Sequence, residues 1–373
     1  MIKTQINMKR IQIALVSKET LPVFYLINEF LPEVVYLVGT SQTGEEMANI
    51  EKVAQGINVS CEKRITKSDD MKDSYRVCKE IVIENGEDNE YCYNLTCGTK
   101  LMAFGALVCA QEYKSKVLYT DTTFYTDLDQ FERKPLTRML DIDTIIALQG
   151  QKVKDKQLYK PDEARTMCAK DIQDFVQYHV GTYSTLAEHY RKYKQIPNPY
   201  NEKDISYSYK NGRLVIEQNG VEIFSSDYKG VYKMLFEGRW WETLVADAVY
   251  QWTGGKQEVW TSVRFEPKSD SKKNIDKNEI DVLVNIGNVL LFVECKSGAF
   301  TQDNIYKLAS VYKTYGSYKS KGVIVSYRDN VIKPELEEKA KEEHVKILVP
   351  VNKKTSKVNL ATELDKVVKM IKS

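Results

Sequence analysis

The chain has 373 residues, of which 42% are hydrophobic and 28% are charged, and its formal net charge is +2. This length predicts two or three domains, and the composition is that of a globular protein. A nearly neutral chain has no global basic field, so any surface that binds nucleic acid must be local.

Cysteine and histidine usage excludes several classes of protein. The seven cysteines are odd in number and form no Cys-x-x-Cys pair, which argues against a disulfide framework and a zinc ribbon and fits a reducing cytoplasm. The three histidines lie far apart, so histidine-based metal or nucleophile chemistry is not expected. No stretch approaches the roughly 20 apolar residues of a membrane span, and the N-terminus lacks a signal-peptide pattern.

Up to about Gly150, short apolar runs alternate with segments of helical periodicity. Predicted strands cover 12–17, 34–40, 92–96, 116–122 and 144–148, and predicted helices cover 20–30, 44–55 and 99–112. Strands that alternate with helices predict a mostly parallel sheet covered on both faces, so we expect an α/β, Rossmann-like domain over residues 1–150.

Polar residues follow three of these strands, where open parallel sheets bind their ligands. They are Ser17, Lys18, Thr40, Ser41, Gln42, Thr96, Gly98, Thr99 and Lys100. Helix N-termini attract anions, and Lys100 in a first turn is unfavourable unless an anion neutralises it. The alternative is that Gly98 makes a turn, Thr99 caps a helix and Lys100 is solvated. Neither G-x-G-x-x-G after the first strand nor G-x-x-x-x-G-K-[ST] occurs, which disfavours a dinucleotide oxidoreductase and a P-loop ATPase.

The run YNLTCGTKLMA at 93–103 resembles the signature of CARF domains, the CRISPR-associated Rossmann-fold sensors of cyclic oligoadenylates. The resemblance covers about the first 150 residues. It implies a homodimer that binds one cyclic tetra-adenylate across its two-fold axis through the three loops above. Cys97 stands where the family often has another glycine, so the turn is expected to be slightly less permissive.

Residues 151–227 predict a connector rather than a further domain. The segment 161–194 has helical character, and 205–224 alternates apolar and polar residues around Asn211-Gly212 and Asn219-Gly220, which favour hairpin turns. We expect a helical and β-hairpin spacer without catalytic chemistry.

One amphipathic helix is predicted from Gly230 to Trp252, followed by a strand at 260–266. Glu242 lies at the margin of the apolar stripe of this helix, a position where a glutamate is more often only a flanking residue.

The segment 278–297 predicts a hairpin of two apolar strands around a Gly287-Asn288 turn. Glu294 and Lys296 project from the same side of one strand, and Asp281 on the other strand can reach them. Carboxylates are costly to bury in an apolar strand unless they share a divalent cation. The alternative is a strand that ends in solvated charges.

The order Asp281, then Glu294-Cys295-Lys296, resembles the PD-(D/E)xK nuclease superfamily, in which Asp and Glu hold Mg²⁺ or Mn²⁺ and Lys assists the attack on phosphate. Residues 228–373 would form this domain, and Glu242 matches the acidic residue that the preceding helix commonly carries. The resemblance implies Asp281, Glu294, Glu242 and the backbone carbonyl of Cys295 as metal ligands, with Lys296 as a catalytic residue.

Additional substrate contacts are predicted around this hairpin. The lysine-rich run 267–277 could guide a phosphate backbone toward Asp281, and Gln302 and Lys307 on the following helix are further candidates.

A nucleotide sensor followed by a nuclease core resembles the stand-alone CARF and PD-(D/E)xK effectors of type III CRISPR antiviral defence. We therefore predict a cytoplasmic endonuclease that cyclic tetra-adenylate activates and that uses Mn²⁺ or Mg²⁺ to cleave single-stranded DNA and RNA with little sequence specificity. One alternative is a ligand-gated nucleic-acid-binding regulator with an inert nuclease fold. Another is a ring nuclease that degrades the cyclic oligoadenylate.

Overall fold

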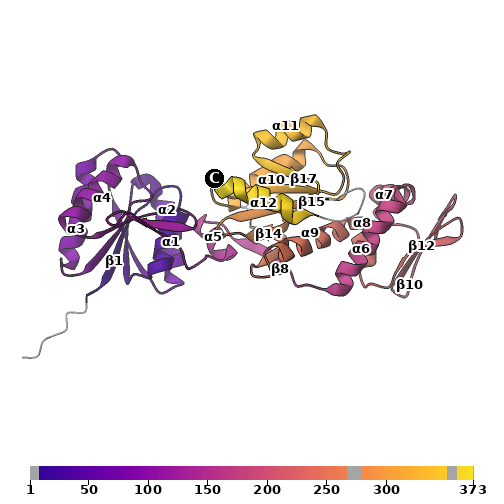
Figure 1. Ribbon diagram of the computed structural model, residues 1–373, viewed down its shortest axis with the longest axis horizontal. Helices are drawn as coiled ribbons and strands as arrows, with labels where there is room; N and C mark the ends of the chain where they lie inside the picture. Colours follow the sequence, from indigo (N-terminus) through magenta and orange to yellow (C-terminus); the bar gives the residue numbers. More distant parts are fainter. Residues whose placement is uncertain (1–7, 267–278, 351–358, 373) are drawn as a thin grey trace, which may run out of the picture.

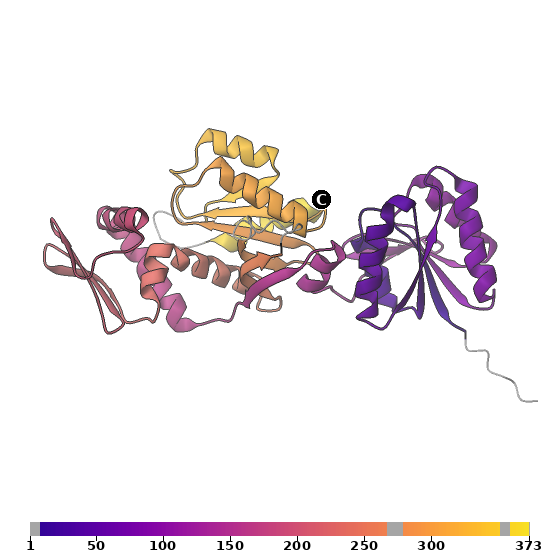
Figure 2. The ribbon, with the colours of Figure 1, turned by 180° about the vertical axis from the view of Figure 1, so that it is seen from behind.

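The computed structural model describes residues 8–266, 279–350 and 359–372. Within these ranges the strands form sheets of seven, four and six strands. Figures 1 and 2 show an elongated molecule, with the N-terminal sheet at one end, the four-stranded sheet at the other and the six-stranded sheet between them. This mixed α/β architecture confirms the predicted fold class. The lysine-rich run 267–277 and the first residue of the predicted hairpin lie outside the described residues.

The N-terminal sheet has a parallel core in the order β3-β2-β1-β4-β5, to which β6 and β7 add antiparallel strands. Its strands are β1 (Arg10–Leu15), β2 (Val34–Gly39), β3 (Ser60–Ile65), β4 (Glu90–Asn94), β5 (Lys116–Thr120), β6 (Phe124–Asp127) and β7 (Glu132–Pro135). The helices are α1 (Leu21–Phe30), α2 (Gly44–Gln55), α3 (Met71–Asn85) and α4 (Lys100–Glu112). Because α1 and α2 belong to one hydrophobic cluster and α3 and α4 to another, the helices cover opposite faces, as predicted.

Two parts of this region differ from the prediction. The segment 144–148 belongs to a helix, α5 (Ile142–Leu148), and not to a strand. Asp141 caps this helix, with its Oδ1 accepting the N–H of Thr144 at 2.6 Å, and a short apolar run looks alike in a helix and in a buried strand. The prediction also lacked β3, α3, β6 and β7. β3 is mostly polar, and none of its residues is buried.

The six-stranded sheet has the order β17-β16-β15-β14-β13-β8. Its strands are β8 (Val153–Leu158), β13 (Val259–Phe265), β14 (Glu279–Asn285), β15 (Leu290–Lys296), β16 (Lys321–Ser326) and β17 (Val345–Leu348). Helices α9 (Arg239–Trp252) and α12 (Leu360–Lys372) pack on one face, and α10 (Gln302–Tyr315) and α11 (Pro334–Glu342) on the other. The predicted hairpin is confirmed as β14 and β15, but β8 shows that the predicted connector also supplies an edge strand to this sheet.

The remainder of the segment 151–227 has the predicted helices and hairpins. They are α6 (Glu163–Tyr178), α7 (Val180–Tyr193), β9 (Tyr200–Glu202), β10 (Ile205–Lys210), β11 (Arg213–Gln218) and β12 (Val221–Ser226). Both Asn-Gly turns have positive φ at each central residue, as tight hairpins require. The single helix predicted over 230–252 is wrong: Gly238, at φ +82°, separates α8 (Val231–Glu237) from α9, because a left-handed residue ends a right-handed helix.

No helix in the described ranges is long and apolar enough to cross a membrane.

Candidate active site and ligand loops

The polar residues predicted for the sensor gather at one edge of the N-terminal sheet. β2, β1 and β4 are neighbours and run parallel, so the segments that follow them leave the sheet at the same edge. All nine predicted residues are at least partly exposed there: Ser17, Lys18, Thr40, Ser41, Gln42, Thr96, Gly98, Thr99 and Lys100. The structure therefore brings the three predicted loops together.

The loop after β4 has a backbone shape that favours glycine. Gly98 has φ +82°, and a Cβ there would lie 3.2 Å from the Cβ of Leu15. Thr99 caps α4, since its Oγ1 accepts the N–H of Met102 at 3.2 Å. Among the described residues Lys100 has no ion pair, so this first helical turn presents an uncompensated positive charge to the loop edge.

A fourth loop, at 66–70, borders the same edge and was not predicted. It joins β3 to α3 and contacts the loop after β4, where the hydroxyl of Thr99 donates to the carbonyl of Ser68. β3 runs parallel to β2, so its following loop belongs to the same edge of the sheet. Any ligand held by the three predicted loops would have this fourth loop beside it.

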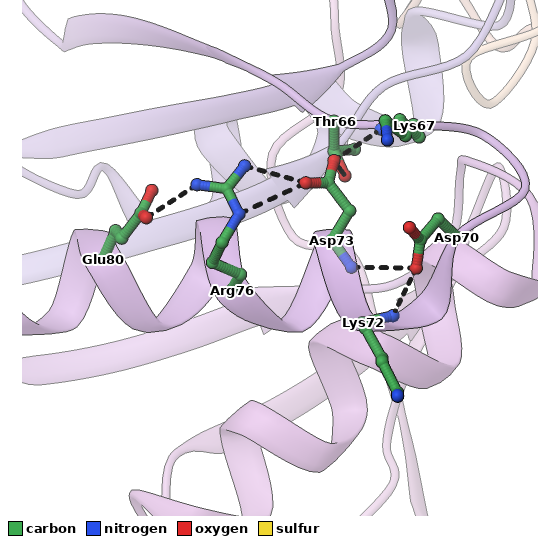
Figure 3. Close-up of polar contacts among 7 residues, drawn as sticks. All are labelled: Thr66, Lys67, Asp70, Lys72, Asp73, Arg76 and Glu80. Atoms are coloured by element: carbon green, nitrogen blue, oxygen red, sulfur yellow. Dashed lines mark hydrogen bonds and ion pairs between the residues drawn. The ribbon is translucent and has the colours of Figure 1, made fainter.

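The acidic residues of α3 fix the shape of this fourth loop, as Figure 3 shows. The carboxylate of Asp73 accepts the Thr66 hydroxyl at 3.0 Å and the N–H of Lys67 at 2.9 Å, and it pairs with Arg76 at 2.8 Å. Asp70 caps the helix through the N–H groups of its second and third residues. An aspartate followed by a first-turn acid predicts a helix start, so the sequence did contain a signal for α3.

A cavity of about 210 Å³ lies beside the six-stranded sheet, and both Glu242 on α9 and Asp281 on β14 line it. The preceding residue, Trp241, is fully buried, and its Nε1 donates to the carbonyl of Val325 on β16 at 2.9 Å. This anchor fixes α9 against the sheet, so the rigid elements α9 and β14 set where the two carboxylates stand. Four cationic side chains also line the cavity: Arg165, Lys229, Lys233 and Arg239.

The remaining predicted catalytic residues lie where β14 and β15 meet. The Oδ2 of Asp281 accepts the backbone N–H of Cys295 at 2.6 Å. The Nζ of Lys296 donates to the Oε1 of Glu294 at 2.7 Å, and the Nζ of Lys307 lies 4.0 Å from the same oxygen. The thiol of Cys295 packs in the hydrophobic core, as its alternation along the strand predicts. Gln302 begins α10 and is exposed.

Burial and mutual repulsion perturb the acids of this cluster. Burial raises the pKa of Glu242 to about 7; Arg239 opposes the shift and the charge of Glu294 adds to it. Burial, and then the charges of Glu294 and Glu242, raise the pKa of Asp281 well above its usual range. Burial disfavours the charged form of Lys296, but attraction to Glu294 raises its pKa overall, so the ammonium group stays charged. A bound cation would stabilise the charged forms of these acids.

The chemistry of this donor set fits a hard divalent cation, because Mg²⁺ and Mn²⁺ bind carboxylate and carbonyl oxygens. Nevertheless, no three His, Cys, Asp or Glu side chains of the described segments already stand close enough together to hold a metal ion. Glu294 instead bonds to Lys296. Coordination by Asp281, Glu242 and Glu294 together would therefore require these side chains to move closer to one another.

Two protein families match this chain, one on each side of the connector. Residues 11–147 match the family described as the Card1 CARF domain, and residues 231–363 match the Card1-like endonuclease domain. The chain therefore has a CARF domain followed by an endonuclease domain. The loop edge described above is thus part of the CARF domain. Glu242 and Asp281 belong to the endonuclease domain, whereas Arg165 and Lys229 in the same cavity precede its matched residues.

Solved structures share this fold over nearly the whole chain. Can2 from Sulfobacillus thermosulfidooxidans, solved in complex with cyclic tetra-adenylate, is 17% identical with a TM-score of 0.73, covering 97% of this chain and 99% of that one. Protein VC1899 from Vibrio cholerae is 15% identical with a TM-score of 0.74, covering 96% and 98%. A type III CRISPR defence DNA nuclease activated by cyclic oligoadenylate is 17% identical with a TM-score of 0.56, covering 85% of this chain and 45% of that one. No curated protein sequence matches the chain.

Cys97 has a structural part in the CARF domain that the sequence did not predict. Its side chain is buried, and its Sγ donates to the carbonyl of Glu19 at 3.3 Å, which joins the loop after β4 to the loop after β1. Burial raises the pKa of the Cys97 thiol, which keeps it protonated and able to donate. Gly98 still takes its left-handed conformation, so the cysteine does not prevent the turn.

Proposed function

We propose that this protein is a homodimeric endonuclease of type III CRISPR defence that cyclic tetra-adenylate activates and that cleaves single-stranded DNA and RNA with a divalent cation. One observation carries the proposal: the partly buried carboxylates of Glu242 and Asp281 share a single cavity with four cationic side chains. Hydrolysis of a phosphodiester needs both, because the acids hold a metal and the cations attract the phosphate.

The CARF loops would bind the activator through hydroxyl groups, helix N-termini and lysines. The exposed Lys18 and Lys100 and the free N–H groups at the start of α4 suit the phosphates of a cyclic oligonucleotide. The structure of Can2 with cyclic tetra-adenylate, a protein of the same fold, supports this ligand. One ring across a two-fold axis would engage the loops of both protomers.

In the endonuclease domain, Asp281, Glu294 and Glu242, together with the backbone carbonyl of Cys295, would hold Mn²⁺ or Mg²⁺. When bound, such a cation polarises a phosphoryl oxygen and activates a water molecule. Lys296 would orient the water and stabilise the negative charge that develops on the phosphate.

The substrate would enter along the cationic side of the cavity. Lys229 and Lys233 have no ion pair among the described residues, and the guanidinium of Arg165 lies over the ring of Tyr159 at 5.3 Å. Contacts of this kind bind the backbone of a strand and do not read its bases. They therefore support cleavage with little sequence preference.

The test combines purified protein, Mn²⁺ and labelled single strands of DNA and RNA, with and without cyclic tetra-adenylate. We expect rapid cleavage only when activator and metal are both present, and its loss when EDTA is added. Equal rates with and without activator would exclude the switch, and full activity of Glu294→Ala would exclude the site. Binding of the strands without cleavage would indicate the inert regulator, and linear products from the activator would indicate a ring nuclease.

A further inference from the structure

The turn of the catalytic hairpin inserts into the CARF domain. β14 and β15 carry Asp281 and Glu294, and their turn is formed by Gly287 and Asn288. Asn288 has no exposed surface, although hairpin turns usually lie in solvent. The burial comes from residues more than a hundred positions earlier in the chain, which belong to the CARF side of the molecule.

Both ends of the Asn288 amide are bonded to the backbone of the CARF domain. Its Oδ1 accepts the N–H of Leu140 at 2.9 Å, and its Nδ2 donates to the carbonyl of Thr122 at 2.9 Å. Nearby, the Nδ2 of Asn285 donates to the carbonyl of Leu140 at 2.6 Å. A buried amide with both groups satisfied fixes position as well as contributing stability, because moving it would leave polar groups unpaired.

The turn geometry explains why an asparagine fits here. Gly287 and Asn288 have φ of +76° and +64°, so both central positions need residues that tolerate the left-handed region. Asparagine tolerates it better than most residues with a side chain, and it carries a donor and an acceptor. The same residue therefore closes the hairpin and joins it to the other domain.

Helix α1 connects one of the ligand loops to this turn. The loop with Ser17 and Lys18 leads into α1, and the hydroxyl of Tyr25 on α1 approaches the carbonyl of Asn288 at 3.4 Å. Residues of α1 and of the hairpin strands share one hydrophobic cluster. A shift of α1 on ligand binding would therefore act directly on the turn.

From the turn, the path to the catalytic residues is a rigid one. Asp281 lies seven residues before Asn288 and Glu294 lies six residues after it, in the two adjoining strands of the sheet. At about 3.3 Å per residue this is roughly 20 Å of paired strand, with no flexible linker. The covalent route instead enters the same sheet at its edge strand β8, which pairs with β13 and not with either strand of the hairpin.

We propose that Asn288 is a positioning residue through which the CARF domain sets the arrangement of Asp281 and Glu294. This inference rests on the proposed function, since it names how the activator signal reaches the nuclease site. Asn288 contacts neither substrate nor activator in this scheme; it acts by holding the hairpin to the sensor.

The test is Asn288→Gly, which keeps a residue suited to positive φ and removes both side-chain bonds. The matched control is Asn211→Gly, at the exposed turn between β10 and β11, where φ is +51°. Three quantities are measured for the full-length protein: affinity for cyclic tetra-adenylate by calorimetry, and kcat and KM for a labelled single strand with Mn²⁺, with and without activator.

For Asn288→Gly we expect the ratio of activated to basal kcat to fall about tenfold, within the usual range of coupling between sites. Its KM for the strand and its affinity for the activator should stay within about twofold of wild type, the scatter expected of sites that are not themselves altered. A general loss of stability would not lower the ratio of activated to basal kcat while leaving KM and activator affinity unchanged. Asn211→Gly should retain the wild-type ratio.

An unchanged ratio in Asn288→Gly would overturn the inference while leaving the proposed function intact. If wild type itself shows no response to the activator, the proposed function fails and the inference fails with it. If Asn288→Gly does not fold, Asn288→Asp is measured in its place. The aspartate can still accept the N–H of Leu140, but it has no donor for the carbonyl of Thr122. A wild-type ratio in that variant would equally overturn the inference.

Discussion

The two candidate sites of this molecule are built in opposite ways. The CARF loop edge consists of exposed residues on loops and first helical turns, at the ends of β1, β2 and β4. The acids of the endonuclease cavity, Glu242 and Asp281, are partly buried and stand on a helix and a strand. Loops suit a large, flexible ligand, whereas a metal-dependent reaction needs charges that are fixed before the substrate arrives.

The two sites also affect the stability of the folded protein in different ways. The acids of the endonuclease domain repel one another and are partly removed from water, so they oppose folding until a cation binds. The CARF edge instead depends on backbone shape, above all at Gly98. The two sites should therefore respond differently to substitution, and the predictions below test that difference.

The largest effect is expected from Asp281→Asn. The asparagine retains the shape of the side chain and an oxygen that can accept the N–H of Cys295, but it removes one ligand charge. We expect cleavage with saturating activator to fall by about a thousandfold, as for other catalytic groups, with unchanged activator affinity. Thermal unfolding without metal should occur at a higher temperature than in wild type, because Glu294 and Glu242 lose a repulsive neighbour.

The control for Asp281→Asn is Glu258→Gln, which removes an exposed acid just before the neighbouring strand β13 and outside the lining of the cavity. Its cleavage rate should stay near that of wild type. If Asp281→Asn cleaved at the wild-type rate, or if both variants lost activity equally, the special role of Asp281 would be refuted.

A smaller effect is expected from Gly98→Ala. Left-handed backbone costs a residue with a side chain about 1–2 kcal/mol, and the added Cβ would also crowd Leu15. We expect the loop of Gly98→Ala to relax to an unstrained shape, which activator binding must then reverse. If this costs about 1.4 kcal/mol of binding free energy, the affinity for the activator falls about tenfold. Calorimetry measures the affinity, and cleavage at saturating activator should be retained.

Gly86→Ala is the matched control for Gly98→Ala. Gly86 has φ +93° but no atom within 4 Å of its would-be Cβ, and it follows α3 at the opposite edge of the sheet. Both positions have positive φ, at which a side chain is strained, yet the activator affinity of Gly86→Ala should not change. An equal loss of affinity in both variants would show that the effect is one of general stability.

The pairing of the strands that carry Asp281 and Glu294 could be predicted from the sequence because the two residues are close along the chain. Asp281 and Glu294 lie on consecutive strands of one hairpin, so the turn and the alternation of the strands suffice to bring them together. The bond between Asn288 and Thr122 spans 166 positions, and no periodicity predicts such a contact. The sequence therefore predicted the turn but not the domain contact that it makes.

Two of the missed strands share a physical cause. β3 (SCEKRI) and β8 (VKDKQL) are mostly charged or polar, and each lies at the edge of its sheet. Charged side chains on edge strands oppose unwanted pairing with other chains, but they also remove the apolar pattern from which strands are predicted. Consequently the fourth CARF loop, which follows β3, was also missed.

The cationic side of the endonuclease cavity combines features of both sites. Lys233 is exposed, like the CARF loops, but it stands on a helix, like Glu242. Lys233→Ala should raise KM for a single strand by about threefold, with little change in kcat, because one phosphate contact is lost. The slope of log KM against log salt concentration should fall by about 0.7. Lys210→Ala, at the end of β10, is the control and should leave both unchanged; an unaltered salt slope in Lys233→Ala would exclude a phosphate contact.

The smallest effect is expected from Cys97→Ser. A serine hydroxyl can replace the thiol as donor to the carbonyl of Glu19, so the loops after β1 and β4 should stay joined. We expect activator affinity within about twofold of wild type, since a neutral bond is exchanged for another of similar strength. Cys97→Ala removes the donor and should weaken binding by a further few-fold. If serine and alanine behaved alike, the bond to Glu19 would have no part in shaping the ligand loops, and packing of the buried side chain alone would explain why a cysteine occupies this turn.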